Sequence, residues 1–532
     1  MDYLPSARQR FLQSLFWAVA VWWLLQLPIV QQSYIGSPDV EGRTLAIKLR
    51  ENDVSGAAAP IVFIDFQRND WLTAAERDRR AVRQEQTQAL EPGAEFVEGD
   101  QPPVPLYMSR AALAEMLDYL SNPALGVAGV FVDVDTDYVT TAREERLFAA
   151  SVERWARRPQ APLLVLARTN WGEDDFIARA GLTLPEHPPV VFGSVEMLAN
   201  EDYEIDSLRY FSCPAEGASV VAAAPIYLAA AARQARQYPD DWAKRAAHAV
   251  DRARNQMTCA QLKAFEEPGA QWLPRDFRAR IGVPDGDFRF DDESGPINYH
   301  VSLDFSEGGG TLISPDTAEL TAAWAAATSA PPNPAVRCRS NQTRVAIALP
   351  ASNVLAKIDD NVPFDESWFC GAIVVIGSSY NEVVRDTYLT PLGPMPGSLI
   401  MANAARGMDL AGPLARFPFH IGLGVVLLVT TLVFAAFELA RRMSEWVINL
   451  PARTQSARML RWSAEMLTHS LTVGVLTTHL AFVAGLALTL AALNWGYWGV
   501  FAAPALAAAA SNAFDEFNAM RRALFLKDDH EV

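Results

Sequence analysis

Short continuous apolar runs, each bounded by turn residues, are the clearest hydrophobic pattern in the middle of the chain. Residues 373–376 read Ile-Val-Val-Ile and are followed by Gly-Ser-Ser. Such a β-branched run is typical of a strand that is buried on both faces of an α/β sheet. Similar runs at residues 61–64 and 127–132 predict two more strands, and residues 109–120 between them carry apolar side chains at helical spacing. Because a strand, helix and strand in this order form a right-handed parallel unit, the pattern predicts an α/β domain with a mostly parallel sheet.

Weaker patterns predict the remaining elements of this domain and the irregular segments between them. We expect strands at residues 161–167, 190–192, 297–303 and 344–349, and helices at residues 144–156, 225–235 and 397–409. Residues 74–105 are rich in charge, Pro and Gly, which indicates an exposed insertion. Residues 236–294 and 306–334 show no strong period and are expected to be loops or insertions.

Four longer apolar runs at the two ends of the chain predict membrane-spanning helices. They are residues 11–30, 419–437, 471–493 and 498–514. The first run is long enough to cross the roughly 30 Å hydrocarbon layer of a bilayer as a helix. A cleaved signal peptide is the alternative for the first run. Its bulky tryptophans and the lack of a small-residue cleavage site after it favour a membrane anchor.

Basic residues between the apolar runs predict which side of the membrane each segment occupies. Residues 438–470 are rich in arginine, whereas residues 494–497 contain no basic residue. By the positive-inside rule the arginine-rich loop is cytoplasmic and the short turn lies outside. The predicted order is a cytoplasmic N-terminus at 1–10, a span, an extracytoplasmic α/β domain at 31–418, three further spans and a cytoplasmic tail at 515–532. The sequence thus predicts one N-terminal and three C-terminal transmembrane helices around the outer domain.

All four cysteines fall within the predicted outer domain: Cys213, Cys259, Cys338 and Cys370. An even number in an oxidising compartment indicates two disulfides, for which the sequence alone allows three connectivities. We favour the sequential pairing, Cys213–Cys259 and Cys338–Cys370. The alternative is four buried thiols, because free cysteine is often a small core residue.

The formal net charge of −17 and the lack of catalytic motifs exclude several function classes. No basic patch suited to a phosphate backbone is evident, so nucleic acid is not an expected partner. The cysteines show no C-x-x-C spacing and the histidines are scattered, so neither zinc nor another metal or cofactor is expected. No nucleotide-binding loop or nucleophile elbow is present, and we do not expect an enzyme.

Acidic residues that follow the predicted strands are candidates for a binding site. Asp65 ends the first strand and Asp133 ends the strand at 127–132, and ligands of parallel sheets collect at the carboxyl ends of strands. For Asp65 a turn or cap role is an equally good interpretation. Asp133 and Asp135 also match ligand positions of a calcium loop that would close at Glu144. Tyr138 replaces the glycine that the loop needs, and a helix capping box explains Glu144 more simply.

The order of residues 373–403 resembles the closing motif of the class-two CHASE family, the sensory extracellular domains of bacterial receptors. In that family a strand ending V-x-I-G is followed by an Asp, a TP turn, an MPG segment and an A-N helix that leads to a membrane helix. The matching residues here are Val374, Ile376, Gly377, Asp386, Thr390, Pro391, Met395, Pro396, Gly397, Ala402 and Asn403. Asp65, Arg110 and Asp133 match the family's earlier strands and helix, and Asp206 and Arg209 match its Asp…Arg strand.

The resemblance implies a sensory receptor of the bacterial inner membrane, with its large domain in the periplasm. Because no output domain follows the last predicted span, a separate cytoplasmic or membrane effector protein is the expected partner, with a second copy of the chain as a further candidate. A structural or scaffold subunit of an envelope complex is the alternative. The candidate ligand-binding or coupling residues are Asp65, Arg110, Asp133, Asp135, Arg209, Asp386 and Asn403. His479 is a polar residue within the third predicted span, where an interhelical hydrogen bond is the simpler interpretation.

Overall fold

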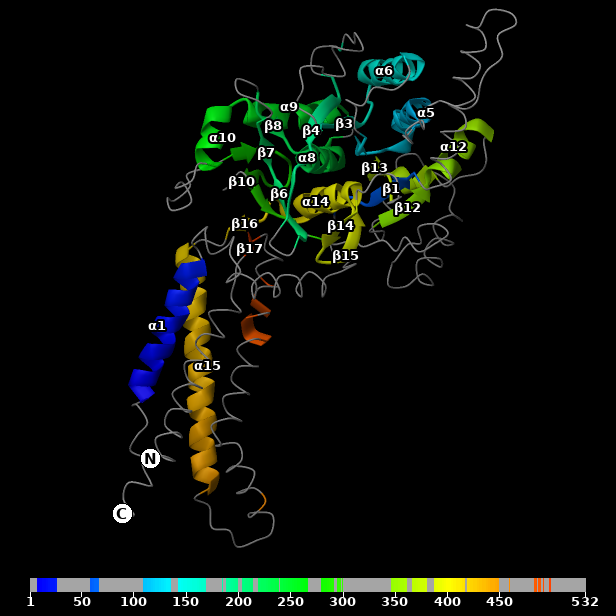
Figure 1. Ribbon diagram of the computed structural model, residues 1–532. Coiled ribbons are helices and arrows are strands. Elements are labelled where there is room, and N and C mark those ends of the chain that lie inside the picture. Colours follow the sequence, from blue (N-terminus) through cyan, green and yellow to red (C-terminus); the bar gives the residue numbers. More distant parts are fainter. Residues whose placement is uncertain are drawn as a thin grey trace, which may run out of the picture. The chain divides into compact units, whose positions relative to one another are not determined.

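A computed structural model gives the structure of the protein (Figure 1). It describes residues 7–25, 58–66, 109–134, 142–168, 184, 188–199, 203–213, 219–238, 240–266, 279–290, 294–297, 299, 346–360, 366–379, 387–416, 419–448, 459, 483–485, 487–488, 491 and 497–498. The chain divides into two compact units, of which the larger comprises Ile47–Glu267 and Arg275–Leu414. The smaller unit holds the two ends of the chain and Pro268–Pro274.

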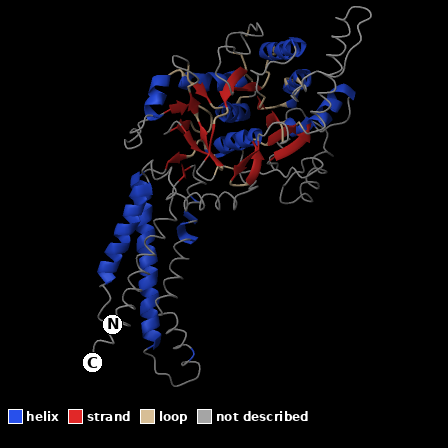
Figure 2. Cartoon of the chain, viewed as in Figure 1, coloured by secondary structure: helices blue, strands red, loops and turns tan. Residues whose placement is uncertain are grey.

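A six-stranded parallel sheet forms the centre of the larger unit (Figures 1 and 2). Its order is β12-β1-β13-β2-β3-β4, and every neighbouring pair is parallel. The strands are β1 (Ile61–Asp65), β2 (Gly129–Val132), β3 (Leu163–Arg168), β4 (Val190–Ser194), β12 (Ala346–Pro350) and β13 (Ile373–Gly377). The predicted parallel α/β fold is therefore confirmed, with the run at 373–376 in the middle of the sheet.

Alternation along the strands explains why both faces of the sheet are covered. Ile61 and Phe63 belong to one buried apolar cluster, whereas Val62 and Ile64 belong to another. Successive side chains of a strand point to opposite faces, so a continuous apolar run can feed two cores at once. The sheet is the middle layer of three.

Helices form the two outer layers of the larger unit (Figure 1). Residues of α5 (Arg110–Leu120), α6 (Ala142–Arg157) and α12 (Ala351–Asp360) share one cluster with Val62. Residues of α8 (Ala224–Gln237), α9 (Trp242–Arg254) and α14 (Gly397–Ala411) share the other cluster with Phe63. Each layer covers one face of the sheet, which is the arrangement that a parallel sheet requires.

Smaller strands and helices complete the larger unit. A three-stranded sheet consists of β5 (Met197–Ala199), β6 (Ile205–Arg209) and β11 (Ser294–Pro296). Three two-stranded pairs are β7 (Phe211–Ser212) with β8 (Val221–Ala222), β9 (Ala279–Ile281) with β10 (Phe288–Phe290), and β14 (Thr387–Thr390) with β15 (Gly393–Pro396). The helices are α10 (Cys259–Glu266) and the short η2 (Pro123–Leu125) and η4 (Glu366–Phe369). Of the strand predicted at 297–303, only Ile297 and Tyr299 are described. The insertion predicted at 74–105 and the loop or insertion predicted at 306–334 lie outside the described residues.

The prediction of loops at 236–294 is wrong, because this stretch contains α9, α10, β9 and β10. The buried face of α9 carries Ala243, Ala246, Ala247 and Val250. These positions have helical spacing, but alanine is only weakly apolar, and the arginines and lysine between them make the segment polar on average. The segment therefore reads as polar although one face of α9 packs in the core.

The predicted disulfide between Cys213 and Cys259 is confirmed, with Cα atoms 5.5 Å apart. It joins the residue after β7 to the first residue of α10. Cys370 is disulfide-bonded as well. Its predicted partner Cys338 lies outside the described residues, so that pairing stays a prediction.

Gly193 on β4 lies against the start of α8, so replacing it with alanine is expected to destabilise the domain. An added Cβ would lie 2.5 Å from Ala224 Cα, which is backbone and cannot turn aside. We expect Gly193→Ala to lower the free energy of unfolding by about 1–3 kcal/mol, the usual cost of overpacking. Gly282→Ala is the control, since the nearest atom to its Cβ would be 3.8 Å away. Equal denaturant midpoints for the two variants would contradict the packing of β4 on α8.

In the smaller unit, α1 (Ala7–Leu25) packs against α15 (Phe419–Ile448). The Phe11 and Phe434 rings lie 5.3 Å apart, and Arg10 Nη2 lies 3.3 Å from Glu438 Oε2. Because Arg10 is near the start of α1 and Glu438 is far along α15, the two helices are antiparallel. A short parallel pair, β16 (Ala415–Arg416) and β17 (Tyr497–Trp498), also belongs to this unit. Within the described part of the chain, no helix has the length and apolarity that crossing a membrane requires.

Candidate functional site

The carboxyl ends of β1, β13 and β2 lie side by side and bring two predicted site residues to one edge of the sheet. β13 lies between β1, which ends at Asp65, and β2, which ends one residue before Asp133. Asp133 N donates a 2.9 Å hydrogen bond to Ile376 O, and Phe66 N donates one of the same length to Gly377 O. The predicted edge is therefore built as expected from parallel strands.

Asp65 is 1% exposed and holds the turn that follows β13. Ser379 N donates to Asp65 Oδ1 at 2.7 Å, and Ser379 Oγ donates to Oδ2 at 2.6 Å. The neighbouring Ser378 Oγ donates to Phe66 O at 2.7 Å. Hydrogen bonds to an ionised carboxylate are short and strong, so Asp65 fixes the geometry of this edge. The turn interpretation of Asp65 is the one that these contacts favour.

Replacing Asp65 with alanine is expected to loosen the turn after β13. The Ser379 N–H would lose its acceptor, and an unsatisfied half-buried donor costs roughly 1–3 kcal/mol. We expect the free energy of unfolding to fall by that amount in a denaturant titration. Asp240, whose described contact is an exposed hydrogen bond from Gln160, is the matched control, with a change within about 0.5 kcal/mol. A change of that small size for Asp65→Ala would show that the turn is held by other contacts.

Arg110 and Glu144 lie near the starts of α5 and α6, two of the helices that cover one face of the sheet. Ser109 caps α5, accepting from Ala112 N at 3.3 Å and donating to Glu144 Oε1 at 3.0 Å. Arg110 is 2% exposed, and its guanidinium carbon lies 5.2 Å from the centre of the Phe148 ring. Ser109, Glu144 and Phe148 thus fasten α5 to α6 near the edge that carries Asp65 and Asp133. The other acidic positions of the calcium-loop pattern, Asp135 among them, lie outside the described residues.

Other predicted site residues are placed elsewhere or not described. Arg209 lies on β6 of the three-stranded sheet, with its Nε 3.2 Å from Glu196 Oε2, and so belongs to a different sheet from Asp65. Asn403 is fully buried in α14, where its Nδ2 donates to Leu399 O at 3.1 Å and lies 3.5 Å from Met395 Sδ. Its amide therefore ties α14 to β15. Asp386 and His479 lie outside the described residues.

A buried charge network at the end of α14 was not predicted from the sequence. The Asp409 side chain is 0% exposed and receives two hydrogen bonds from Arg236, at 2.5 Å on Oδ1 and 2.8 Å on Oδ2. The backbone N–H of Ala59, just before β1, donates to Oδ2 at 2.7 Å. A forked guanidinium contact of this kind fixes direction as well as charge. Asp409 thus joins α14, α8 and the entry to β1.

Arg233 caps the same end of α14. Its Nη2 donates to the carbonyl oxygens of Met408 at 3.1 Å and Asp409 at 2.9 Å, and its Nη1 donates to Gly286 O at 2.8 Å. The last carbonyls of a helix lack internal partners and carry partial negative charge, which a cation stabilises. Arg406 adds a hydrogen bond from Nη1 to Ala59 O at 2.7 Å. We call Arg233, Arg236, Arg406 and Asp409 the α14 network.

Burial and the Asp409 charge act in opposite directions on the two arginines of α8. Burial lowers the pKa of Arg233, which Asp409 only partly offsets. Burial also lowers the pKa of Arg236, but its hydrogen bonds to Asp409 and the charge of that carboxylate more than compensate, so the pKa is raised overall. Both shifts identify Asp409 as the group that makes burial of these charges tolerable.

These features define a doubly wound α/β domain. Its last helix, α14, is held by buried charged side chains and is followed in the chain by the long helix α15. A family model of the CHASE2 domain matches residues 61–436, from the first residue of β1 into α15. The match covers more than half of the chain, and the chain therefore belongs to the CHASE2 family. The resemblance inferred from residues 373–403 is thereby confirmed. CHASE2 domains are extracellular sensory domains of receptors, so this chain carries a sensory domain.

Two further comparisons give no relative. No curated protein and no solved structure matches this chain.

Proposed function

We propose that this chain is a multi-pass receptor of the bacterial inner membrane whose CHASE2 domain binds a ligand or partner outside the cytoplasm. Binding alters the α14 network, and the change passes along the chain through α14 to α15 and on to a separate effector protein. The observation that carries the proposal is the buried carboxylate of Asp409 at the end of the helix that precedes α15. Buried ion pairs hold one arrangement and are costly to break, so they suit an element with two discrete states.

The exposed apolar side chains of α1 and α15 support a membrane location for these two helices. Large apolar side chains of α1 and α15 are exposed, including Phe16 at 66% and Leu428 at 59%. An exposed apolar surface of this kind is expected where the neighbour is lipid. In the antiparallel pair, the start of α1 and the far end of α15 lie at the same end, as a cytoplasmic N-terminus and a cytoplasmic loop at 438–470 require. The four spans and both cytoplasmic ends are part of this proposal.

The disulfides support an outer location for the domain. Cys213–Cys259 and the oxidised Cys370 belong to the larger unit, and structural disulfides persist in oxidising compartments such as the bacterial periplasm. The arginine-rich segment at 438–470 supports the opposite location for that loop. Together they favour the topology in which residues 31–418 face the periplasm.

Co-purification of the intact protein from its native membranes tests the proposed function. The full chain is isolated in a mild detergent after brief cross-linking, and associated proteins are quantified by mass spectrometry. The proposal predicts recovery of an effector such as a kinase, cyclase or protease, through the cytoplasmic loop, the tail or the membrane helices. Recovery of envelope-assembly proteins alone would favour the scaffold alternative, and recovery of no protein above a tagged, unrelated membrane control would contradict a separate effector.

A further inference from the structure

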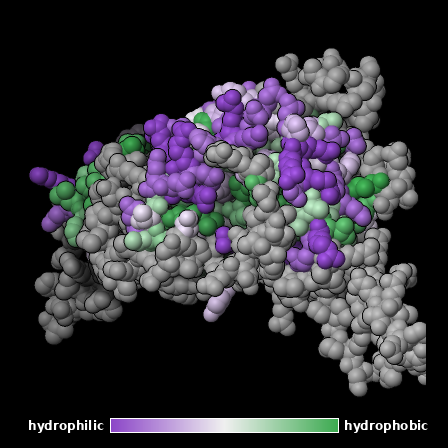
Figure 3. Space-filling model, turned by 90° about the horizontal axis from the view of Figure 1, so that it is seen from above, coloured by the Kyte–Doolittle hydropathy of each residue, from purple (hydrophilic) through white to green (hydrophobic). Residues whose placement is uncertain are grey.

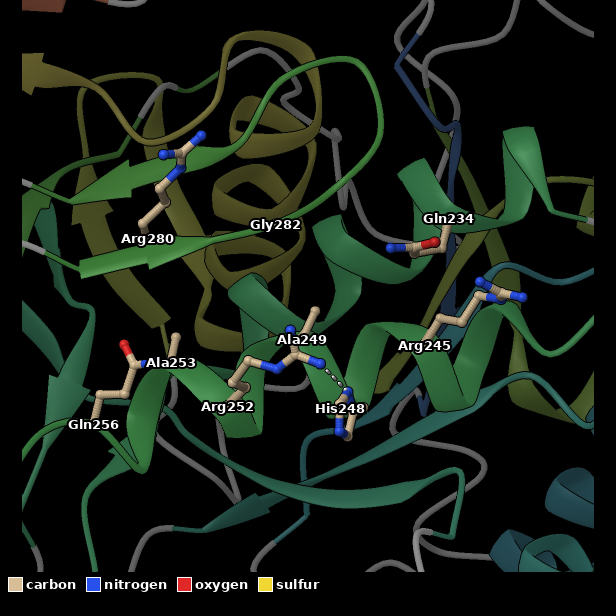
Figure 4. A pocket seen from close by; sticks show the side chains of 9 residues that line it. All are labelled: Gln234, Arg245, His248, Ala249, Arg252, Ala253, Gln256, Arg280 and Gly282. Carbon is tan, nitrogen blue, oxygen red and sulfur yellow. Dashed lines mark hydrogen bonds between the residues drawn. The ribbon is translucent and has the colours of Figure 1, made fainter.

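A cavity of about 230 Å³ lies in the CHASE2 domain between α9, β9 and the end of α8 (Figure 4). Arg245, His248 and Arg252 line it from α9, Arg280 lines it from β9, and Gln234 lines it from α8. The α9 residues follow one another at intervals of three and four positions and therefore share one helix face. We call this cavity the α9 pocket. Its size is below the roughly 300–1,000 Å³ of pockets for drug-sized ligands, so it suits a small molecule.

Positive charge is concentrated in the α9 pocket although the whole chain has a net charge of −17. Among the described residues, Arg280 forms an ion pair with Asp287. Arg245 instead stacks 4.7 Å from the centre of the Tyr238 ring, and Arg252 Nη2 lies 3.4 Å from His248 Nδ1. Neither of these two guanidinium groups pairs with a carboxylate in the described part of the chain. In Figure 4 the two guanidinium groups point in different directions from the same helix, so each can bind a different charged oxygen of one small anion.

A buried amide gives the pocket a second, independent feature. Gln234 is 7% exposed, and its Oε1 has no hydrogen-bond partner in the described structure. In Figure 4 the Gln234 side chain lies across the pocket from His248 and Arg252. Buried amide groups are nearly always satisfied, so the Gln234 carbonyl oxygen at the wall of this cavity is available to a polar group of a bound molecule. A ligand hydroxyl can donate a hydrogen bond to the Gln234 carbonyl oxygen or accept one from the Gln234 NH₂ group, so either orientation of the amide would bind it.

We propose that the α9 pocket binds a small organic oxyanion that carries two negative charges and a hydroxyl group, such as a hydroxydicarboxylate or a phosphate monoester. Arg245, Arg252 and Arg280 bind the charged oxygens, and Gln234 binds the hydroxyl. Figure 3 looks onto the face of the domain that carries α6 and α9, where hydrophilic residues cover much of the described surface. A charged metabolite from solution can reach such a face. That this ligand is the one the receptor senses rests on the proposed function.

The last turns of α8 connect the pocket to the α14 network. Gln234 lines the pocket, while its neighbours Arg233 and Arg236 bind Asp409. The β9–β10 hairpin makes the same connection, because it supplies Arg280 to the pocket and Gly286 O to Arg233. The Arg233 guanidinium carbon also lies 4.6 Å from the centre of the Phe288 ring on β10. A ligand that draws Arg280 and Gln234 inward therefore acts on the residues that hold the end of α14.

Calorimetric titration of the full chain in detergent micelles tests the pocket. The ligands are malate, succinate and glycerol 3-phosphate, with glycerol as the neutral control. We expect saturable binding of malate or of glycerol 3-phosphate with a Kd below about 1 mM and no binding of glycerol. A preference for malate over succinate, which lacks the hydroxyl, identifies a carboxylate ligand, and binding of glycerol 3-phosphate alone identifies a phosphate ester.

Variants of α9 and α8 distinguish this pocket from general attraction to positive charge. Arg245→Gln and Arg252→Gln are each expected to raise the Kd about tenfold, because a lost charge-assisted hydrogen bond is of that order. Lys244→Gln removes the same charge from an exposed neighbour that does not line the pocket and should change the Kd less than about twofold. Gln234→Leu should abolish the preference for a hydroxyl-bearing ligand while leaving most of the charge-dependent affinity.

Two results would overturn the inference. One is the absence of saturable binding by malate, succinate and glycerol 3-phosphate. The other is an equal loss of affinity in Lys244→Gln and Arg245→Gln. Neither result bears on the recovery of an effector, which tests the proposed function separately. If binding depends on Arg245 but co-purification recovers no effector, the α9 pocket is supported and the proposed receptor function is contradicted.

Discussion

Asp409→Ala is expected to lower the free energy of unfolding of the CHASE2 domain by about 3–5 kcal/mol, the range for breaking a buried ion pair by removing one partner. The Arg233 side chain is 8% exposed and that of Arg236 32% exposed, so both guanidinium groups would lose their carboxylate while largely removed from water. Ala59 N would lose its acceptor in addition. Since whole domains are stable by only about 5–15 kcal/mol, this is a large fraction of the total. Urea unfolding of the full chain, followed by tryptophan fluorescence, measures it.

Glu153→Ala is the matched control for Asp409→Ala. Glu153 pairs with Arg157 one turn along α6 with side chains 32% and 63% exposed, and such pairs contribute about 0.3–0.5 kcal/mol. The double variant Arg236→Ala/Asp409→Ala should show a coupling of about 1–3 kcal/mol relative to the two single variants. If Asp409→Ala cost no more than Glu153→Ala, the α14 network would not be a structural lock.

The second large effect is expected from removing the Cys213–Cys259 disulfide. The bond joins residues 46 positions apart, and the chain-entropy relation for a loop of that length gives about 4 kcal/mol. We expect the double variant Cys213→Ala/Cys259→Ala to be less stable by about that amount in the same urea titration. Because the bond fastens the end of β7 to the start of α10, local exchange protection should fall most in α10.

Mass spectrometry of the unreduced protein controls for a change in cysteine pairing. A peptide that contains Cys213 should appear linked to one that contains Cys259, and neither should react with a thiol reagent. The predicted Cys338–Cys370 link is measured in the same digest. If Cys213 is labelled as a free thiol in the native protein, the stability of the double variant has another cause.

Much of the sheet could be predicted because its signal is local. The run at 373–376 is β-branched throughout and bounded by a Gly-Ser turn, which is the pattern of a strand covered on both faces. The parallel arrangement followed from the strand, helix and strand at 61–132. The carboxyl edge followed in turn, since parallel strands all end on the same side, and Asp65 and Asp133 are found there.

The α14 network and the α9 pocket could not be predicted, because neither has a local signal. Asp409 and Arg236 lie 173 positions apart, and nothing in either stretch indicates its partner. The pocket combines residues of three separate elements, α8, α9 and β9, and α9 itself is polar on average because its buried face consists mainly of alanine. Arg209 shows the converse case. Its motif matched the family, but β6 belongs to a separate sheet, and motif order alone does not state which sheet a strand joins.

Hydrogen exchange of the full chain in lipid nanodiscs tests most directly whether α14 couples the CHASE2 domain to α15. The perturbation is Arg236→Lys, which keeps the charge but removes the forked contact to Asp409. The account predicts faster exchange at the end of α14 and in the first turns of α15, with α5 unchanged as an internal reference. Faster exchange confined to α14 and α8, with α15 as protected as in the unmodified protein, would contradict it.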